Sequence, residues 1–268
     1  MLIIDTHCHT GDNWEEPIET LLHQMQANGV SGAVLAQLNG HYDNTYILDC
    51  ARRHKGKFKA VVILDPEDKA RTKTLETLHK QGAAGIRINL RKEKEWDPDD
   101  PVFKVVGELG MVVSLIGNAE NFASTRFKKL LDNCPRTQFC LEHLARSAHP
   151  GVDFAKPPHE GYKAALECAR WPNTTVKVPG LGEIVDRPDR FPGGSVCPLP
   201  NVPPLYDMAK EAFGVRRMMW GSNFPPCAQK EGYRNALQWV RDYPGFQGGD
   251  DIEWIMGKSA AKLWGFSA

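Results

Sequence analysis

The chain has 268 residues, of which 41% are hydrophobic, so one domain can bury a large core. Lys plus Arg and Asp plus Glu each number 33, which gives zero formal net charge at pH 7. This balance argues against nucleic acid or an anionic membrane as the main partner. No apolar run approaches the roughly 18 residues of a membrane span. The start of the chain lacks the basic and apolar regions of a signal peptide.

The seven cysteines are scattered along the chain and form no CxxC pair. Such cysteines are typical of reduced thiols in a cytosolic compartment. We therefore expect a cytoplasmic protein that acts on a small molecule. The oligomeric state is left open, and a homo-oligomer is compatible with the sequence.

Short apolar runs alternate along the chain with amphipathic segments. Continuous apolar runs are typical of strands that are buried on both faces of a parallel sheet. Between them, apolar residues at helical spacing predict helices, for example from Leu205 to Phe213, where Gly214 can end the helix. We predict strands at 2–6, 31–37, 59–64, 84–88, 111–116, 138–142, 174–178 and 217–221.

Eight strands that are each followed by a helix predict an α/β fold, a (β/α)8 TIM barrel with a single domain over residues 1–268. An open doubly wound sheet is the alternative. That fold usually has a glycine-rich phosphate turn after its first strand, where this chain has the run from Asp5 to His9. Residues 179–204, rich in Pro and Gly, are expected to form a long loop at the catalytic end.

His7 and His9 stand at the end of the first predicted strand. Residues two apart on a strand point to the same face, so both imidazoles should project into the mouth of the barrel. There they could bind a divalent metal or an oxyanion, while Cys8 points the other way and packs. Two hydrogen-bonded structural histidines are the alternative interpretation.

His143 and Asn223 follow the sixth and eighth predicted strands. His143 could be a general acid or base, or a metal ligand. Asn223 can donate and accept hydrogen bonds but cannot act as a base. Glu142 could orient neighbouring side chains or form a buried salt bridge. Glu183, in the long loop, could complete the site but is expected to face water, and His41, His149 and His159 are expected to be ordinary surface histidines.

Arg87 lies between isoleucines in the fourth predicted strand. An arginine in an apolar strand implies a carboxylate partner, from the substrate or from the protein itself. We favour the substrate as that partner. Lys177, in the seventh predicted strand, invites the same interpretation with less weight.

Together these segments resemble the amidohydrolase superfamily, in particular the amidohydrolase-related branch that contains lactonases and decarboxylases of acidic substrates. Each motif alone is weak, but their order and spacing match over most of the chain. The segments that carry the resemblance are Ile4–His9, Gly82–Ile88, Leu141–Leu144, Asn173–Gly180, Trp220–Pro225 and Met256–Leu263.

The resemblance implies one divalent metal, commonly zinc, held by His7 and His9 with an aspartate at the last strand and often a histidine on the fifth. This chain departs twice. Asn223 replaces the aspartate, and the fifth strand offers only Ser114 or, further on, Asn118. Two imidazoles and an amide supply no anionic ligand, so metal binding should be poor unless Glu142 or substrate oxygens contribute.

Three functions remain open. The first is a hydrolase of a small carboxylate-bearing lactone or related ester or amide, working without metal. In it His7 and His9 polarise the carbonyl, His143 moves protons, Asn223 positions water or substrate, and Arg87 with Lys177 holds the carboxylate. The second uses zinc or manganese at His7 and His9 for hydrolysis or non-oxidative decarboxylation. The third is a catalytically inactive binding relative, because the usual aspartate is missing.

Overall fold

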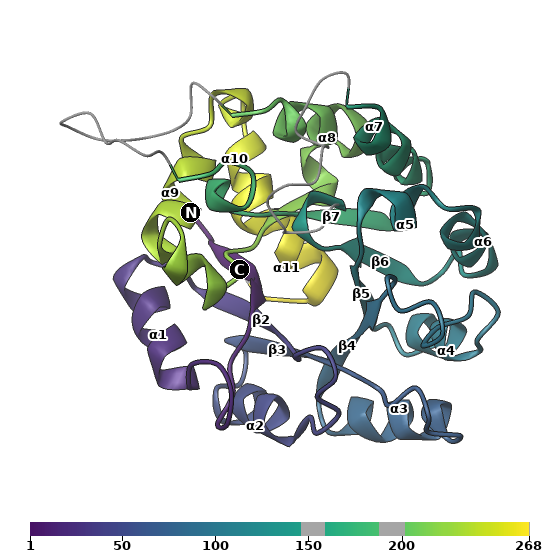
Figure 1. Ribbon diagram of the computed structural model, residues 1–268. Helices are drawn as coiled ribbons and strands as arrows, with labels where there is room; N and C mark the ends of the chain where they lie inside the picture. The colour runs from purple at the N-terminus through teal and green to yellow at the C-terminus, as the bar shows by residue number, and fades with distance from the viewer. Residues whose placement is uncertain (146–158, 188–201, 268) are drawn as a thin grey trace.

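Eight parallel strands form one sheet whose spatial order follows the sequence. The structure is a computed structural model that describes residues 1–145, 159–187 and 202–267. Helices surround the ring of strands (Figure 1), so the predicted (β/α)8 barrel is confirmed and the open sheet is excluded. The strands are β1 (Ile4–Cys8), β2 (Gly32–Ala36), β3 (Phe58–Val62), β4 (Ala83–Asn89), β5 (Val112–Ile116), β6 (Gln138–Leu141), β7 (Thr174–Val178) and β8 (Met218–Trp220).

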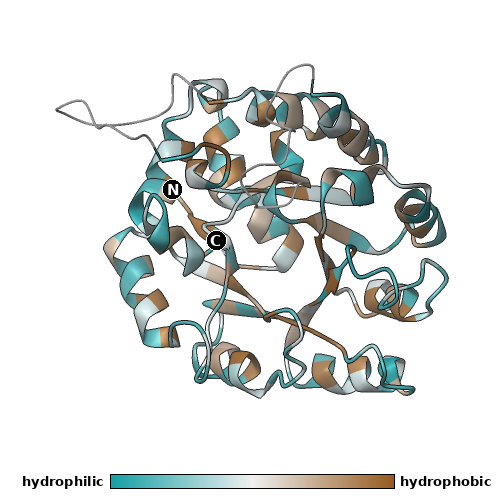
Figure 2. Ribbon diagram, viewed as in Figure 1, coloured by the Kyte–Doolittle hydropathy of each residue, from teal (hydrophilic) through white to brown (hydrophobic). Residues whose placement is uncertain are grey.

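The helices pack on the outside of the barrel, with apolar residues on the sides that face the strands (Figure 2). The helix predicted from Leu205 to Phe213 is confirmed, and Gly214 ends it with a φ of 67°. The α-helices are α1 (Ile18–Ala27), α2 (Thr45–Arg53), α3 (Arg71–Lys80), α4 (Val102–Glu108), α5 (Ala119–Ala123), α6 (Thr125–Asn133), α7 (Glu160–Leu166), α8 (Leu205–Phe213), α9 (Tyr233–Arg241), α10 (Asp251–Glu253) and α11 (Ser259–Trp264).

β1 begins two residues later than predicted and continues through His7 and Cys8. The prediction ended the strand at Thr6 and so included two polar residues, Asp5 and Thr6. In the structure these polar residues are buried and hydrogen-bonded: Asp5 Oδ1 accepts from the Ser222 N–H at 2.8 Å, and Thr6 Oγ1 donates to the Trp220 carbonyl at 2.7 Å. Because β8 and its exit satisfy these groups, the strand tolerates them.

The segment after β8 completes the barrel against β1. The backbone N–H of Asn223 donates to the carbonyl of His7 at 2.9 Å, and the N–H of His9 donates to the carbonyl of Phe224 at 2.7 Å. These two bonds place Asn223 beside both histidines, although their positions in the sequence are far apart.

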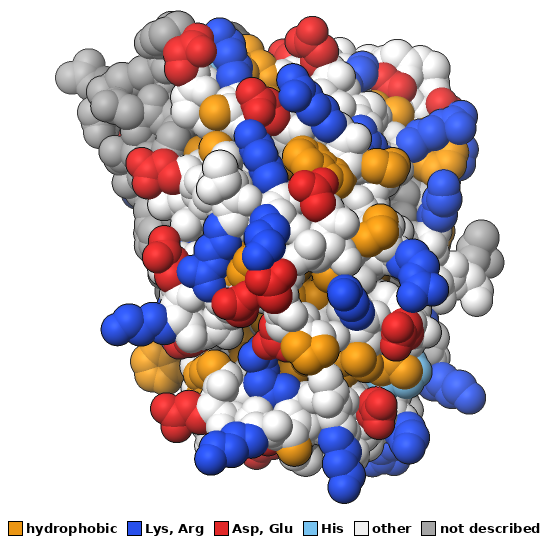
Figure 3. Space-filling model, turned by 90° about the vertical axis from the view of Figure 1, so that its right-hand side faces the viewer, with side chains coloured by type: hydrophobic (Ala, Val, Ile, Leu, Met, Phe, Trp, Pro, Cys, Tyr) orange, Lys and Arg blue, Asp and Glu red, His pale blue; other side chains and the backbone are white. Residues whose placement is uncertain are grey.

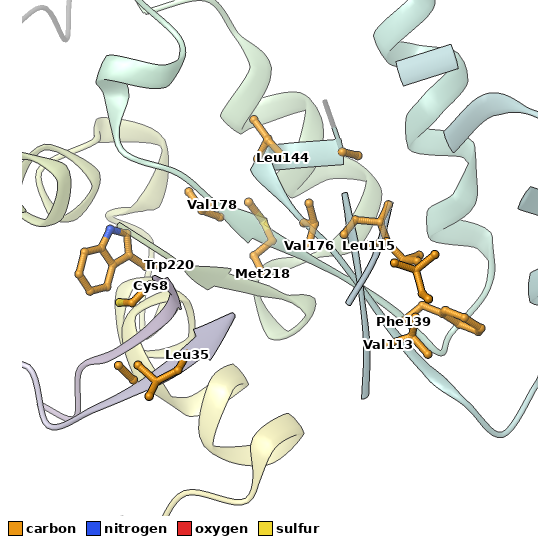
Figure 4. Packing of buried hydrophobic residues seen from close by; sticks show 14 of the residues in the cluster. Cys8, Leu35, Val113, Leu115, Phe139, Leu144, Val176, Val178, Met218 and Trp220 are labelled. Carbon is orange, nitrogen blue, oxygen red and sulfur yellow. The ribbon is translucent and has the colours of Figure 1, made fainter. Parts of the chain in front are cut away.

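Two apolar clusters support the barrel. The larger one fills the space between strands and helices, and Figure 4 shows part of it, with Val113, Val176 and Trp220 among the labelled residues. The smaller one lies inside the barrel and takes residues from six strands together with Trp264 and Phe266 at the C-terminal end. Its other fully packed members are Ile4, Val34, Val61, Val112, Cys140, Met219 and Ala260.

The side chains that point into the barrel change from apolar or small to polar toward the C-terminal ends of four strands. Side chains two residues apart share a face of a strand, so the next inward-facing residue comes two positions later. The resulting pairs are Gly85 and Arg87 on β4, Val112 and Ser114 on β5, Cys140 and Glu142 at β6, and Thr175 and Lys177 on β7.

On the face formed by α3, α4 and α6, basic and acidic side chains are interspersed (Figure 3). This distribution agrees with the balanced composition. Within the described ranges, every helix is too short or too polar to span a membrane. The six cysteines of those ranges are all buried and free.

Candidate active site

Glu142, directly after β6, is fully buried and paired with Arg87. The Arg87 Nε donates to Oε1 at 3.0 Å and Nη2 donates to Oε2 at 2.8 Å, while Nη1 donates to the Gln37 carbonyl at 2.8 Å. Burial alone would raise the pKa of Glu142, but the Arg87 and Lys177 charges hold it well below its usual range. Glu142 is therefore a carboxylate, and its buried ion pair accounts for the arginine in an apolar strand.

Lys177 joins the same network from β7. Its Nζ lies 2.9 Å from Ser114 Oγ, 3.0 Å from His7 Nδ1 and 3.8 Å from Glu142 Oε1. Ser114 Oγ in turn donates to Glu142 Oε1 at 2.8 Å. Both cations that were assigned to a substrate carboxylate thus lie against a carboxylate of the protein, and a substrate carboxylate is not needed to explain their burial.

The contact with Lys177 determines which nitrogen of His7 carries the proton. An ammonium group can only donate, so His7 Nδ1 accepts. Burial and the Lys177 charge lower the pKa of His7 well below its usual value, so the ring is neutral. Its proton is therefore on Nε2, a buried atom with no hydrogen-bond partner among the described residues. His7 is thus a hydrogen-bond donor in need of an acceptor.

His9 has the opposite tautomer. Its Nδ1 lies 2.7 Å from the carbonyl of Ala36, which can only accept, so Nδ1 carries the proton. Burial and the Arg87 charge lower the pKa of His9 to about 3. The ring centroids of His7 and His9 are 4.9 Å apart, so the two side chains lie next to each other.

His143, Glu183 and Asn223 form a second hydrogen-bonded set. His143 Nδ1 donates to Glu183 Oε2 at 2.7 Å, and the Asn223 amide donates to the other Glu183 oxygen. Burial raises the pKa of Glu183, but the His143 contact outweighs this and lowers it. The Nε2 of His143 lies 4.0 Å from Glu142 Oε2, and the His143 ring centroid lies 4.8 Å from that of His7.

The expectation that Glu183 faces water is wrong, because its exposed fraction is only 5%. A short 3-10 turn, Leu181–Glu183, follows β7 and turns the side chain into the barrel mouth. The only signal in the sequence was its place in the loop after the seventh strand, which lies at the catalytic end.

The backbone around this set has unusual conformations. His143, Leu144 and Ala145 have φ values of 49°, 60° and 57°, and Asn223 has 58°. For residues other than glycine the left-handed region costs roughly 1–2 kcal/mol each. Strain of this kind concentrates at functional sites, where surrounding structure holds it. Here it holds both side chains that bind Glu183.

A cavity of about 540 Å³ opens over these residues. The predicted site residues His9, Arg87, His143 and Asn223 line it, together with residues of the loops after β1 and β2. His7 and Lys177 are buried behind them. His41, expected at the surface, is exposed and also lines the cavity. His149 lies outside the described residues.

By distance alone, His7, Glu142 and His143 could hold a metal, since one donor atom from each lies within 4.8 Å of the others. This cluster differs from the predicted pair of His7 and His9. Its hydrogen bonds do not suit a cation, however. Both Glu142 oxygens already accept from Arg87, and Lys177 occupies His7 Nδ1. Two fixed positive charges next to the carboxylate oppose a third, so the donors as arranged do not fit a divalent ion.

The fold and this set of strand-end side chains define an amidohydrolase-type barrel enzyme site. The chain belongs to the amidohydrolase family, whose model matches residues 4–266. The family assignment made from the sequence motifs is therefore confirmed.

Three solved structures with the same fold illustrate the likeness. A protein of Pseudomonas putida assigned as a 2-pyrone-4,6-dicarboxylic acid hydrolase is 20% identical (TM-score 0.77; 100% of this chain, 98% of that one). A zinc-bound amidohydrolase of Burkholderia multivorans is 18% identical (TM-score 0.79; 100% of both chains). The 5-carboxyvanillate decarboxylase of Sphingomonas paucimobilis is 14% identical (TM-score 0.63; 99% of both chains). Likeness at this level of identity establishes the common fold.

Proposed function

We propose that this protein hydrolyses a lactone or a related ester without using a metal ion. The observation that carries the proposal is the pairing of two imidazoles that are held by different partners. His143 offers Nε2 as base, because its Nδ1 is bound to Glu183, and His7 offers an Nε2–H as donor, because Lys177 occupies its Nδ1. The ring centroids of these two histidines are 4.8 Å apart.

In the first step, His143 Nε2 removes a proton from water while the water oxygen bonds to the ester carbonyl carbon. The carbonyl π electrons move to oxygen, and His7 Nε2–H donates to that oxygen as its charge develops, which requires the carbonyl to reach past the lining residues to the buried His7 ring. The Lys177 ammonium on the far side of the His7 ring strengthens this donor. Glu183 stabilises the imidazolium that forms at His143.

In the second step, the tetrahedral intermediate collapses. The carbonyl re-forms, the bond from carbon to the alcohol oxygen breaks, and His143 returns its proton to the departing oxygen. A lactone yields a hydroxy acid, and the enzyme returns to its starting state. Asn223 keeps Glu183, and through it His143, in position during both steps.

The sequence also predicted a carboxylate on the substrate, held by Arg87 and Lys177. Both cations are paired with Glu142, so the proposed reaction needs only the ring ester itself. Arg87 also lines the cavity.

The proposal is tested with a panel of five- and six-membered lactones and the variant His143→Asn. We expect turnover by the wild-type protein and a fall in kcat of about 10²- to 10⁴-fold in the variant, because the base is lost. Glu183→Gln should lower kcat less, since Nε2 remains. Full turnover by His143→Asn would contradict the role of the base. Failure of the wild-type protein on every lactone would favour the inactive binding relative.

A metal-dependent hydrolase or decarboxylase is the second candidate. It is favoured by the proximity of His7, Glu142 and His143, and by the zinc in the Burkholderia multivorans relative. Zinc or manganese there would require proton rearrangement at His7 and release of Glu142 from Arg87. Dependence of turnover on metal content separates the two candidates.

A further inference from the structure

The loop after β1 is a tightly built wall of the cavity. Thr10 Oγ1 and the Gly11 N–H both bind the carbonyl of Glu16, at 2.8 and 3.2 Å. A Cβ on Gly11 would lie 2.2 Å from the carbonyl oxygen of Trp14, so only glycine fits there. Glu15 has a φ of 73°, the left-handed region that side chains disfavour. The loop is therefore held in one shape that presents residues 12–15 to the cavity.

Trp14 is the principal apolar group on this wall. Its exposed fraction is 77%, the highest among the large hydrophobic side chains of the described residues, yet it lines the cavity. Further apolar contacts inside the cavity come from Leu38, Tyr46 and Ile116. An exposed indole beside a cavity is suited to stack on a flat ring, where both partners lose apolar area to water.

Among the described residues that line the cavity, acidic side chains outnumber Lys and Arg. Arg87 is the single lining Lys or Arg of the described ranges, and Glu142 neutralises it. Asp12 and Glu15 also line the cavity. Like charges near a cleft lower the local concentration of an anionic substrate.

We infer that the site takes an uncharged lactone or ester with a flat apolar ring, and that loop 10–16 sets this specificity. Trp14 binds the ring, and Asp12 with Glu15 disfavours analogues that carry a carboxylate. The inference rests on the proposed function and names its substrate class.

The first test compares two substrates of the same ring, 3,4-dihydrocoumarin and its carboxylate-substituted analogue. We expect kcat/KM of the wild-type protein to be at least about 10-fold higher for the uncharged ring, as one disfavoured charge in a cleft implies. The ratio should shrink at 1 M salt, where charges are screened beyond about 3 Å. Equal or better hydrolysis of the carboxylate would overturn the inference.

Variants of the loop separate charge from stacking. Asp12→Asn with Glu15→Gln should raise kcat/KM for the carboxylate alone, while Glu19→Gln on α1, outside the cavity lining, should change neither substrate. Trp14→Ala should raise KM for both rings by about 3- to 10-fold, in the range of a lost aromatic contact. Trp14→Phe should restore most of the affinity. A Trp14→Ala variant with unchanged KM would remove the role of the indole.

Binding measurements keep this inference distinct from the proposed function. If neither ring is hydrolysed, the proposed hydrolysis fails for this ring system. The His143→Asn protein is then titrated with each ring by calorimetry. Preferential binding of the uncharged ring would support the specificity, and equal or reversed preference would contradict it.

Discussion

At the scale of single residues, proton location gives the two histidines of the first strand different chemistry. His7 faces an ammonium and must keep its proton on Nε2, whereas His9 faces a carbonyl and keeps it on Nδ1. The spacing of His7 and His9 predicts that they share a face. It carries no information on these partners, because they come from β7 and β2.

Replacing Lys177 tests whether the tautomer of His7 matters. In Lys177→Met the donor to Nδ1 is lost, so the proton is free to move to Nδ1, which lies 3.8 Å from Glu142 Oε1. We expect kcat to fall about 10²- to 10³-fold, as for the loss of one oxyanion donor. Nitrogen-15 NMR of the histidines should show the change at His7. Unchanged kcat in a folded variant would rule out this role for Lys177.

His143 and Asn223 were predictable as site residues from their places after strands six and eight, whereas Glu183 was not. Glu183 stands in a polar loop where most acidic residues face water. Its burial depends on the short turn at 181–183 and on two partners that are distant in sequence. Ser114 was noted only as the residue in place of a missing histidine, and its bond to Glu142 could not be foreseen.

At the scale of elements, the exit of β8 is packed against β1. A Cβ on Gly221 would lie 2.8 Å from the Cβ of His7 and 3.1 Å from its nitrogen. This close approach lets the β8 exit bind the His7 and His9 backbone. Glycine at 221 is therefore required for the position of His7, although the residue bears no chemistry.

Gly221→Ala should shift His7, because the nearest neighbours are the backbone and Cβ of that residue. We expect a fall in kcat of about 10²-fold, typical of a displacement of about 1 Å at a reacting group. Gly107→Ala is the matched control, since its Cβ would meet Thr137 at 2.5 Å, away from the cavity lining. That variant should lose thermal stability but keep kcat. The same loss of kcat in both variants would contradict a local effect at His7.

Strand alternation was the most informative pattern at this scale. At the inward-facing positions of β4 to β7, an apolar or small residue is followed by a polar one. The barrel interior therefore has an apolar layer with a polar layer next to it, at the C-terminal ends of the strands. The sequence predicts each strand from its apolar run. It ends the first strand at Thr6, although the structure continues that strand to Cys8, where the exit of β8 binds its backbone.

At the scale of the whole molecule, the buried neutral histidines make stability depend on pH. The pKa of His9 is about 3 in the folded protein and near 6.5 when exposed, so the unfolded chain binds more protons between these values. The free energy of unfolding must therefore fall as pH decreases through that window. The lowered pKa of Glu142 acts in the same direction below 4.5.

Urea unfolding at pH 7 and pH 4 measures this effect. We expect the wild-type protein to lose on the order of 2–4 kcal/mol over the interval from His9 alone. His9→Asn should be less stable at pH 7 but should lose less on acidification. His23→Asn, on the exposed side of α1, should behave as the wild-type protein does. An equal pH dependence in His9→Asn would contradict the neutral state of His9.

The barrel was predictable as a whole because eight buried parallel strands leave few other topologies. The proposed substrate specificity was less predictable than the barrel. It depends on the loops after β1 and β2 and on the pairing of Arg87 inside the barrel. The cytoplasmic location and the possible homo-oligomer stay predictions.

Hydrolysis of a lactone by protein freed of metal is the most direct measurement of the proposed chemistry. Protein treated with a chelator is assayed, and its metal content is measured by mass spectrometry on the same sample. With His143 as base and His7 as donor, kcat should be unchanged at less than about 0.1 metal per chain, far below the stoichiometric occupancy of a resident metal. Loss of turnover on chelation, restored by zinc or manganese, would contradict the metal-independent mechanism.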